Sequence, residues 1–325
     1  MSTKTTVIHH SADYDGIFCR EIARKFLPNA ELIGWDYGNP KLPFPPEGKV
    51  YVLDLSPECF DTSYSDECHS RLVWIDHHKS AIDRFWSNIP GYRIDGVAAC
   101  RLAWQWFTTE KYGSFNAGGA AWWVKLPTKE QFVSREVKEP VSVRLAGEYD
   151  IWDKRDPDAD LFQHGLRSMD LTGRWNDLLA INAKLSVDEI ERLVEAGHHD
   201  MLAPDGTTKP AIVWTLLENG RALQYANTKE NESVIKAAGF TIEFEGLKFL
   251  ACNAARYNSH LFTAGLTPEH DGCFGFAYRD GHWAVSLYHA PGKEHHDLSQ
   301  IAVKYGGGGH RGACGFRAKT LPFLA

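Results

Sequence analysis

The chain has 325 residues, of which 43% are hydrophobic and 24% are charged, and its formal net charge at pH 7 is -7. This length favours two domains over one small core, and the composition is that of an ordinary globular protein. The acidic balance argues against a grip on long duplex nucleic acid, which needs many contacts to phosphates. Because no apolar run approaches the about 20 residues of a bilayer span and no signal peptide is recognisable, we expect a cytoplasmic protein without a membrane partner.

The cysteines and the acidic residues indicate different chemistry. Seven cysteines occur singly, without a Cys-x-x-Cys pair. This predicts reduced, packed thiols and neither a zinc site nor a disulfide framework. Bound metal ions would neutralise some of the carboxylates, so the net charge is compatible with a small phosphate ligand.

The first predicted strand, residues 5–10, ends in a polar loop that carries His9, Asp13 and Asp15. Apolar residues recur at helical spacing after this loop, so a helix follows the strand. Two carboxylates two positions apart, with an imidazole four positions before the first, could ligate one or two cations. The alternative is an Asp-rich helix N-cap, which does not account for the histidine.

Two later strands end in residues of the same kind. Residues 50–53 and 72–75 are apolar runs typical of strands buried on both faces of a sheet, and another strand is predicted at residues 31–35. A parallel sheet brings the ends of its strands to one edge, where ligands bind in open α/β sheets. For any single strand, a polar turn that caps the next helix is the alternative. The polar residues at these two strand ends are Asp54 and the triplet Asp76, His77 and His78.

The middle of the chain is predicted to be mainly helical. Residues 98–107 and 141–149 have the spacing of helices that pack on the sheet, and Asp150, which follows the second, is a candidate metal ligand. Residues 114–123 are expected to form a loop whose paired tryptophans belong to the core rather than to a base-stacking platform.

A helical connector is predicted over residues 186–239, and a second domain begins near residue 240. Within the connector, His198 to Asp200 precede a turn and are expected on the solvated surface. The second domain contains short strands joined by glycine-containing turns. These strands are predicted at residues 241–244, 247–252, 272–278 and 282–288.

A run of four glycines, Gly306 to Gly309, follows a short helix predicted at residues 300–305. Glycines let the backbone approach a ligand closely, and their amides can surround an anion. His310 and Arg311 come next and can pair with phosphate. A glycine run can also be a flexible linker, but this one lies inside a domain.

Taken in order, these motifs resemble those of the DHH phosphoesterase family with the DHHA1 C-terminal domain, and the resemblance covers essentially the whole chain. It implies an α/β fold in which a doubly wound, mainly parallel sheet is joined by a helical connector to a smaller α/β domain with a mixed sheet. The implied domains are residues 1–185, 186–239 and 240–325, with the active site in the cleft between the two sheets. The matching residues are His9, Asp13 and Asp15; Asp54; Asp76, His77 and His78; Asp150; and Gly307, Gly308, Gly309 and His310.

The resemblance also implies two divalent metal ions, commonly Mn²⁺, with Mg²⁺ or Co²⁺ as other candidates. One ion would be held by His9, Asp13 and Asp54, with Asp54 bridging to the second. The ligands of the second would be Asp15, Asp54, His77 and Asp150. Such a pair of ions activates a shared water and stabilises charge on the phosphorus oxygens.

The remaining motif residues would act on the substrate. Asp76 would orient an imidazole, and His78 would face the substrate phosphate or the leaving oxygen. From the second domain, Gly307 to Gly309 with His310 and Arg311 would bind a phosphate. Family members often carry an arginine where this chain has Tyr288, so the anion contact would fall to Arg311, His289 or His260, or the substrate preference differs.

The function implied is a phosphodiesterase that cleaves short oligonucleotides, or small cyclic or linear nucleotides, to nucleoside monophosphates. Residues 148–152 and 162–166 look most like the oligoribonuclease and cyclic-nucleotide phosphodiesterase branch, and 3′-phosphoadenosine 5′-phosphate is a possible side substrate. The alternatives are a single-strand exonuclease of the RecJ type, a family II pyrophosphatase, and a non-catalytic protein that binds or sequesters nucleotides. A non-catalytic protein of this kind would be expected to lack some of the metal ligands, and in this sequence none of them is missing. Either a monomer or a homodimer is expected.

Overall fold

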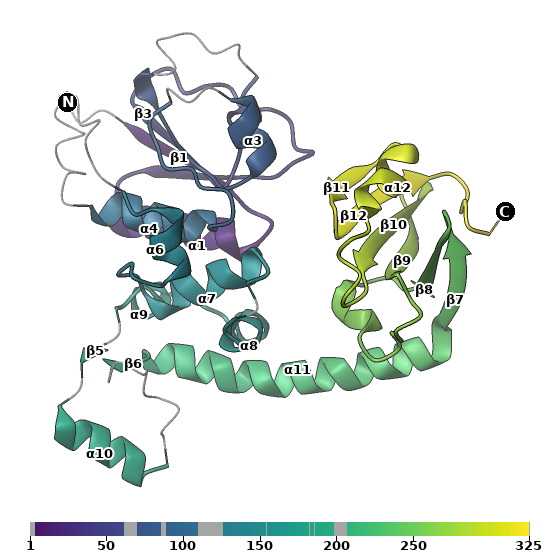
Figure 1. Ribbon diagram of the computed structural model, residues 1–325. Helices are drawn as coiled ribbons and strands as arrows, with labels where there is room; N and C mark the ends of the chain where they lie inside the picture. Colours follow the sequence, from purple (N-terminus) through teal and green to yellow (C-terminus); the bar gives the residue numbers. More distant parts are fainter. Residues whose placement is uncertain are drawn as a thin grey trace. The chain divides into compact units, whose positions relative to one another are not determined.

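The computed structural model describes residues 4–61, 70–85, 89–109, 126–153, 155–181, 183–184, 186–197 and 207–324 (Figure 1). The chain forms two compact units, residues 1–221 and 222–325, which divide within helix α11 (Ala211–Ala238). The predicted loop at 114–123 and the surface triplet His198 to Asp200 lie outside the described residues. None of the described helices combines the length and the apolar character that a membrane span requires.

The first unit is built on a four-stranded parallel sheet with the strand order β2-β1-β3-β4. Its two later strands are almost entirely apolar and buried, as expected for strands covered on both faces. The four strands predicted in this part of the sequence are therefore confirmed. They are β1 (Thr5–His10), β2 (Glu31–Trp35), β3 (Lys49–Leu53) and β4 (Leu72–Ile75).

Alternate side chains of these strands face opposite sides of the sheet. Val7 and Leu53 pack in one core cluster with the helices, whereas Ile8 and Val52 belong to a second cluster with Trp74. Because both faces are covered, the sheet is doubly wound, as predicted. The first cluster draws on helices α1 (Tyr14–Phe26), α4 (Ala99–Thr108), α6 (Lys129–Val133), α7 (Val141–Asp150), α8 (Asp158–Gly165) and α9 (Trp175–Leu178), and on the start of α11.

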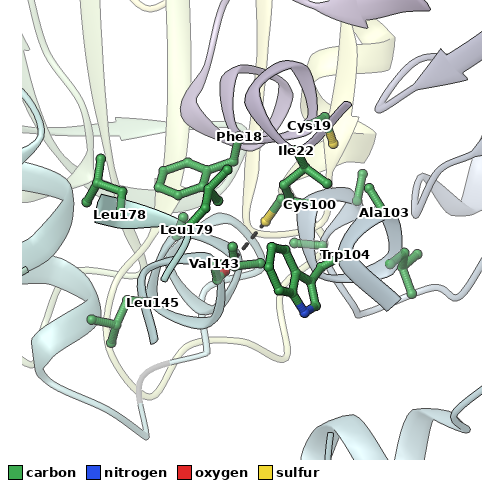
Figure 2. Packing of buried hydrophobic residues seen from close by; sticks show 14 of the residues in the cluster. Phe18, Cys19, Ile22, Cys100, Ala103, Trp104, Val143, Leu145, Leu178 and Leu179 are labelled. Carbon is green, nitrogen blue, oxygen red and sulfur yellow. Dashed lines mark hydrogen bonds between the residues drawn. The ribbon is translucent and has the colours of Figure 1, made fainter. Parts of the chain in front are cut away.

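The first cluster is centred where α1, α4 and α7 meet (Figure 2). Phe18 of α1 and Cys100 of α4 are both fully buried there, and the Cys100 thiol donates to the carbonyl of Val143 at 3.6 Å. All six cysteines in the described part of the chain are buried and free. This agrees with reduced thiols that serve as packing residues.

A buried ion pair ties α4 to the segment before α7. Arg101 and Glu139 are almost fully buried, and Arg101 Nε donates to Glu139 Oε1 at 2.9 Å. Removing one partner leaves an uncompensated charge in the core, so we expect Glu139→Gln to lower the free energy of unfolding by about 3 kcal/mol. Urea denaturation monitored by circular dichroism measures this loss. A double variant with Arg101→Met should recover part of it, whereas a loss below about 1 kcal/mol would show that the pair contributes little.

The second unit holds a six-stranded mixed sheet with the order β11-β12-β10-β9-β8-β7. Its core gathers Phe244, Phe274 and Phe316 around one face of the sheet. The strands are β7 (Gly239–Phe244), β8 (Leu247–Asn253), β9 (Gly272–Arg279), β10 (His282–His289), β11 (Gly308–His310) and β12 (Ala313–Ala318), and α12 (Leu298–Lys304) follows β10.

The two predicted hairpin turns of this sheet have the expected backbone. Glu245 and Gly246 have φ values of 52° and 77°, and Asp280 and Gly281 have values of 50° and 80°. Positive φ at both central residues is the mark of a type I′ turn, which suits the twist of two antiparallel strands. A parallel four-stranded sheet and a separate mixed sheet together confirm the predicted fold class.

The remaining elements are short, apart from α11. Residues 186–239, predicted as a helical connector, contain α10 (Val187–Glu195), the two-residue strand β6 (Thr207–Thr208) and α11. β6 pairs with β5 (Ala183–Lys184). The others are α3 (Lys79–Arg84) and the 3₁₀ turns η1 (Pro57–Cys59) and η3 (Ser259–Phe262).

Candidate metal centre

The carboxylate of Asp15 is held by the start of helix α4. It accepts hydrogen bonds from the backbone N–H of Ala99, at 2.8 Å, and of Cys100, at 2.7 Å. These are N–H groups that the helix itself leaves unbonded, and the helix N-terminus favours negative charge. A fully buried side chain is thereby fixed at the carboxyl edge of the sheet.

One imidazole nitrogen meets three carboxylates beside it. His77 Nε2 lies 3.3 Å from Asp150 Oδ2, 3.5 Å from Asp54 Oδ1 and 3.6 Å from Asp15 Oδ2. These residues come from the ends of β3, β4 and α7 and from the first turn of α1. Asp15, His77 and Asp150 offer ligand atoms close enough together to surround one cation.

A second group of ligand atoms lies at the end of β1. His10 Nδ1 lies 2.8 Å from Asp13 Oδ2 and 3.4 Å from Asp54 Oδ2. Asp13 is also the N-cap of α1, because its Oδ1 accepts from the N–H of Gly16 at 3.0 Å. The carboxylate of Asp13 therefore has both of the roles that the sequence left open. Its Oδ1 caps the helix, and its Oδ2 is directed to the cluster.

Asp54 stands between the two groups. Its Oδ1 faces His77 and its Oδ2 faces His10, and both oxygens are buried without a hydrogen bond among the described residues. Its backbone is left-handed, with φ 59°, which is uncommon outside glycine and is often found at functional sites. Although burial opposes it, the contacts with His10 and His77 lower the pKa of Asp54 to about 2, so this side chain is a charged carboxylate between two imidazoles. The donor set thus fits divalent metal, with one oxygen of Asp54 available on each side.

The electrostatics of the cluster lead to the same conclusion. Burial raises the pKa of Asp15 well above its usual value, and the carboxylates of Asp54 and Asp150 raise it further. Burial also raises the pKa of Asp150 to about 6, although the nearby His77 opposes the rise. Against the effect of burial, the same carboxylates raise the pKa of His77 to about 10, so a protonated imidazole offsets part of their mutual repulsion. A divalent cation held between the carboxylates would offset it in the same way.

Asp76 orients His78 rather than His77. Fully buried, it accepts through Oδ1 from the backbone N–H of His77, at 2.7 Å, and lies 2.8 Å from His78 Nδ1. Its Oδ2 accepts from the indole N–H of Trp74 at 3.2 Å. The half-buried His78 also lies within reach of Asp54 and His77.

The structure does not place His9 in the cluster, although the sequence motif assigned it to the first metal. His9 is 3% exposed, and its Nδ1 bonds to the carbonyl of His10 at 2.7 Å. Its ring lies beside Gly34, where an added Cβ would come within 3.4 Å of His9 Cε1. The reason is the alternation of side chains along β1, which turns His9 to the face of Val7 and His10 to the opposite side.

Asp36 is a site residue that the sequence motifs did not include. It follows directly after β2, and its Oδ1 lies 3.2 Å from His10 Nε2, so it fixes the ring that presents Nδ1 to Asp13 and Asp54. A carboxylate behind a ligating imidazole typically contributes 10- to 100-fold in metal affinity. We expect Asp36→Asn to weaken Mn²⁺ binding by about 10-fold, measured by isothermal titration calorimetry. The exposed Asp83, paired with Lys79, gives the control Asp83→Asn, and equal affinities for all three proteins would contradict the assignment.

In the second unit, the last two glycines of the run and His310 form the edge strand β11. β11 pairs antiparallel with β12, and a Cβ at Gly307 would lie 2.0 Å from the carbonyl oxygen of Gly315. A Cβ at Gly309, where φ is 130°, would lie 2.6 Å from Cys314 Cα, so these two glycines are required by strand packing alone. At Gly308 an added Cβ would meet open space instead. His310 and Arg311 are exposed beside it, in keeping with a ligand-facing edge.

Of the residues expected to contact an anion in the second unit, His289 is packed against its neighbours. His289 Nε2 bonds to the carbonyl of His296 at 2.8 Å, and the ring packs against Gly312. His289 is therefore held inside the unit. Tyr288 is half-buried, and burial raises its pKa. Of the candidates for an anion contact, the exposed Arg311 has the most accessible side chain.

The chain was compared with known families, sequences and solved structures, and only solved structures gave matches. No family model matches the chain, and no curated protein matches its sequence. Its structure is similar to the DHH domain of a protein that is described as a member of a family of ribosomal proteins. The TM-score is 0.50, with 13% identity over 97% of this chain and 83% of that one.

Two further solved structures match more loosely. A pGpG-specific phosphodiesterase from Vibrio cholerae matches with a TM-score of 0.47 and 13% identity over 97% of this chain and 93% of that one. An exopolyphosphatase-related protein from Bacteroides fragilis matches with a TM-score of 0.47 and 10% identity over 98% and 88%. At such identities structural similarity shows the fold and not the activity. The chain has the fold of the DHH-domain proteins.

Proposed function

We propose that the protein is a metal-dependent phosphodiesterase that hydrolyses short oligonucleotides, or small cyclic or linear nucleotides, to nucleoside monophosphates. The observation that carries this proposal is the convergence of two imidazoles and three further carboxylates around Asp54 at the carboxyl edge of a parallel sheet. Open α/β sheets bind their ligands at this edge. The fold shared with a DHH domain supports the same reaction class by analogy.

The ligand groups fit two divalent cations. His10, Asp13 and Asp54 would hold one, and Asp15, His77 and Asp150, with the other oxygen of Asp54, would hold the second. Carboxylate and imidazole donors together suit Mn²⁺, which is the ion we propose, with Mg²⁺ and Co²⁺ as weaker candidates. When bound, such a pair activates water near neutral pH and stabilises the negative charge that develops on the phosphoryl oxygens.

The chain's own residues would position the substrate. Asp76 holds His78 by Nδ1 at 2.8 Å, so the other nitrogen of His78 is directed to a phosphate or to the leaving oxygen. In the second unit, Gly308, His310 and Arg311 on the exposed edge would supply backbone and side-chain donors that bind a phosphate. A long duplex is a poor substrate for so acidic a chain.

A substrate panel tests the proposal. Purified protein with Mn²⁺ is incubated with a dinucleotide, a cyclic mononucleotide, a cyclic dinucleotide, 3′-phosphoadenosine 5′-phosphate and pyrophosphate, and the products are separated by chromatography. We expect nucleoside monophosphates from at least one phosphodiester. Orthophosphate from pyrophosphate alone would instead indicate a pyrophosphatase. Binding of nucleotides without any turnover would identify a sequestering protein.

A further inference from the structure

Helix α7 ends in a left-handed turn at a residue type that rarely adopts one. The N–H of Trp152 donates to the carbonyl of Tyr149 at 3.1 Å, and the N–H of Asp153 donates to that of Glu148 at 2.8 Å. This is a helix C-cap in which the residue with positive φ is usually glycine. Here it is Trp152, with φ 57°, although a bulky side chain is disfavoured in this conformation.

The indole ring of Trp152 is not part of the core. It is 52% exposed, and it lies nearly parallel to the half-buried ring of Tyr149, with an interplanar angle of 25° and 6.3 Å between centroids. The strained backbone therefore holds an aromatic face toward solvent instead of burying it. An exposed aromatic kept at a conformational cost is a candidate for ligand contact.

The turn that carries Trp152 directly follows a residue of the metal centre. Trp152 is two residues beyond Asp150, so their Cα atoms lie within about 7 Å of each other. Asp150 Oδ2 is 3.3 Å from His77 Nε2, in the middle of the ligand cluster. A ligand whose phosphate lies at the cluster would therefore have its remaining groups within a short distance of this turn.

Ion pairs flank the turn that carries Trp152. The fully buried Glu148 accepts hydrogen bonds from Arg135 Nε, at 2.9 Å, and from the guanidinium of Arg144, at 2.9 Å. Arg144 also bonds to Asp156 at 2.7 Å, beyond the turn. Ion pairs on both sides thus fix the backbone, so the ring is positioned before a ligand arrives.

We propose that Trp152 is a base-stacking residue, which receives the nucleobase attached to the phosphate at the metal centre. The inference deepens the proposed function and rests on it. Stacking on an indole tolerates any base, because every base has a π face, so this subsite would select for a nucleobase without selecting its identity. It would distinguish nucleotide substrates from pyrophosphate and polyphosphate.

Binding of two matched ligands tests this inference. Isothermal titration calorimetry, with Mn²⁺ present, compares adenosine monophosphate with ribose 5-phosphate, which has the same phosphate and no base. We expect Trp152→Gly to weaken binding of adenosine monophosphate about 10-fold, Trp152→Phe to weaken it less, and neither to change binding of ribose 5-phosphate. The exposed Tyr225, 68% accessible on α11, supplies the control Tyr225→Ala.

A stability measurement separates stacking from a structural role. Glycine is the preferred residue at this cap, so Trp152→Gly should unfold at the same temperature as the wild type or higher while it binds the nucleotide less well. Equal weakening of both ligands, or no weakening of either, would overturn the inference, as would a wild type that fails to bind adenosine monophosphate. If the wild type binds it and Trp152 matters, but no phosphodiester is cleaved, then the proposed function fails and the stacking site stands.

Discussion

Replacing Asp54 with asparagine is expected to lower kcat for phosphodiester hydrolysis by at least about 10³-fold. Asn keeps the shape of the side chain and tolerates the left-handed backbone at this position, where φ is 59°. What it loses is one charged oxygen between His10 and His77, the bridging position of the proposed metal pair. The fold should survive, because Asn keeps the size of the side chain, although it loses the contacts with His10 and His77 that, against the effect of burial, lower the pKa of Asp54 to about 2.

Two measurements are needed to interpret this variant. Steady-state hydrolysis of the best substrate in the panel gives kcat, and thermal unfolding without metal shows whether the protein is folded. We expect the metal-free variant to unfold cooperatively, at a temperature somewhat below that of the metal-free wild type, because a carboxylate with a lowered pKa stabilises the fold when it is ionised. Asp83→Asn, an exposed residue paired with Lys79, is the control for a lost carboxylate. Activity within 10-fold of the wild type in a folded Asp54→Asn protein would rule out the bridging assignment.

Of the two adjacent histidines in β1, we expect only His10 to be required for metal binding. His10→Gln should weaken Mn²⁺ binding by about 10³-fold and reduce the stoichiometry from two ions to one, because it removes a ligand from the group with Asp13 and Asp54. His9→Gln should bind two ions with unchanged affinity, since the ring of His9 lies beside Gly34 on the other side of β1.

Calorimetric titration of both variants with Mn²⁺ checks the prediction, and each variant serves as the control for the other. His9 is buried, so its replacement is expected to lower thermal stability while metal binding persists. Loss of one ion from His9→Gln but not from His10→Gln would restore the assignment made from motif spacing.

Much of the first unit is predictable because its signals are local. The runs at residues 31–35 and 72–75 became strands with the predicted bounds, and the polar residue after each of three strands lies at one edge of the sheet. The turns at Glu245 and Asp280 were equally clear, since each precedes a glycine that can adopt positive φ. Apolar periodicity and turn chemistry operate over a few residues and are visible in a single sequence.

The details of the site depend on geometry that spacing does not specify. His9 fits a motif by its distance from Asp13 in sequence, but the pleat of β1 decides which ring turns toward the carboxylates. Asp36 belongs to the site only because β2 and β1 are neighbours in parallel register, where His10 pairs with Trp35. A long-range pairing of this kind cannot be read from either segment alone.

The central claim is that the strand ends form a site for two metal ions joined by Asp54. Crystals of the intact protein soaked in MnCl₂ test it directly, with diffraction data collected for anomalous scattering from manganese. We expect two anomalous peaks about 3.5–4 Å apart, one on each side of the Asp54 carboxylate, with His10 on one ion and His77 on the other. An absence of peaks at these residues, or a peak at His9 instead of His10, would contradict the account.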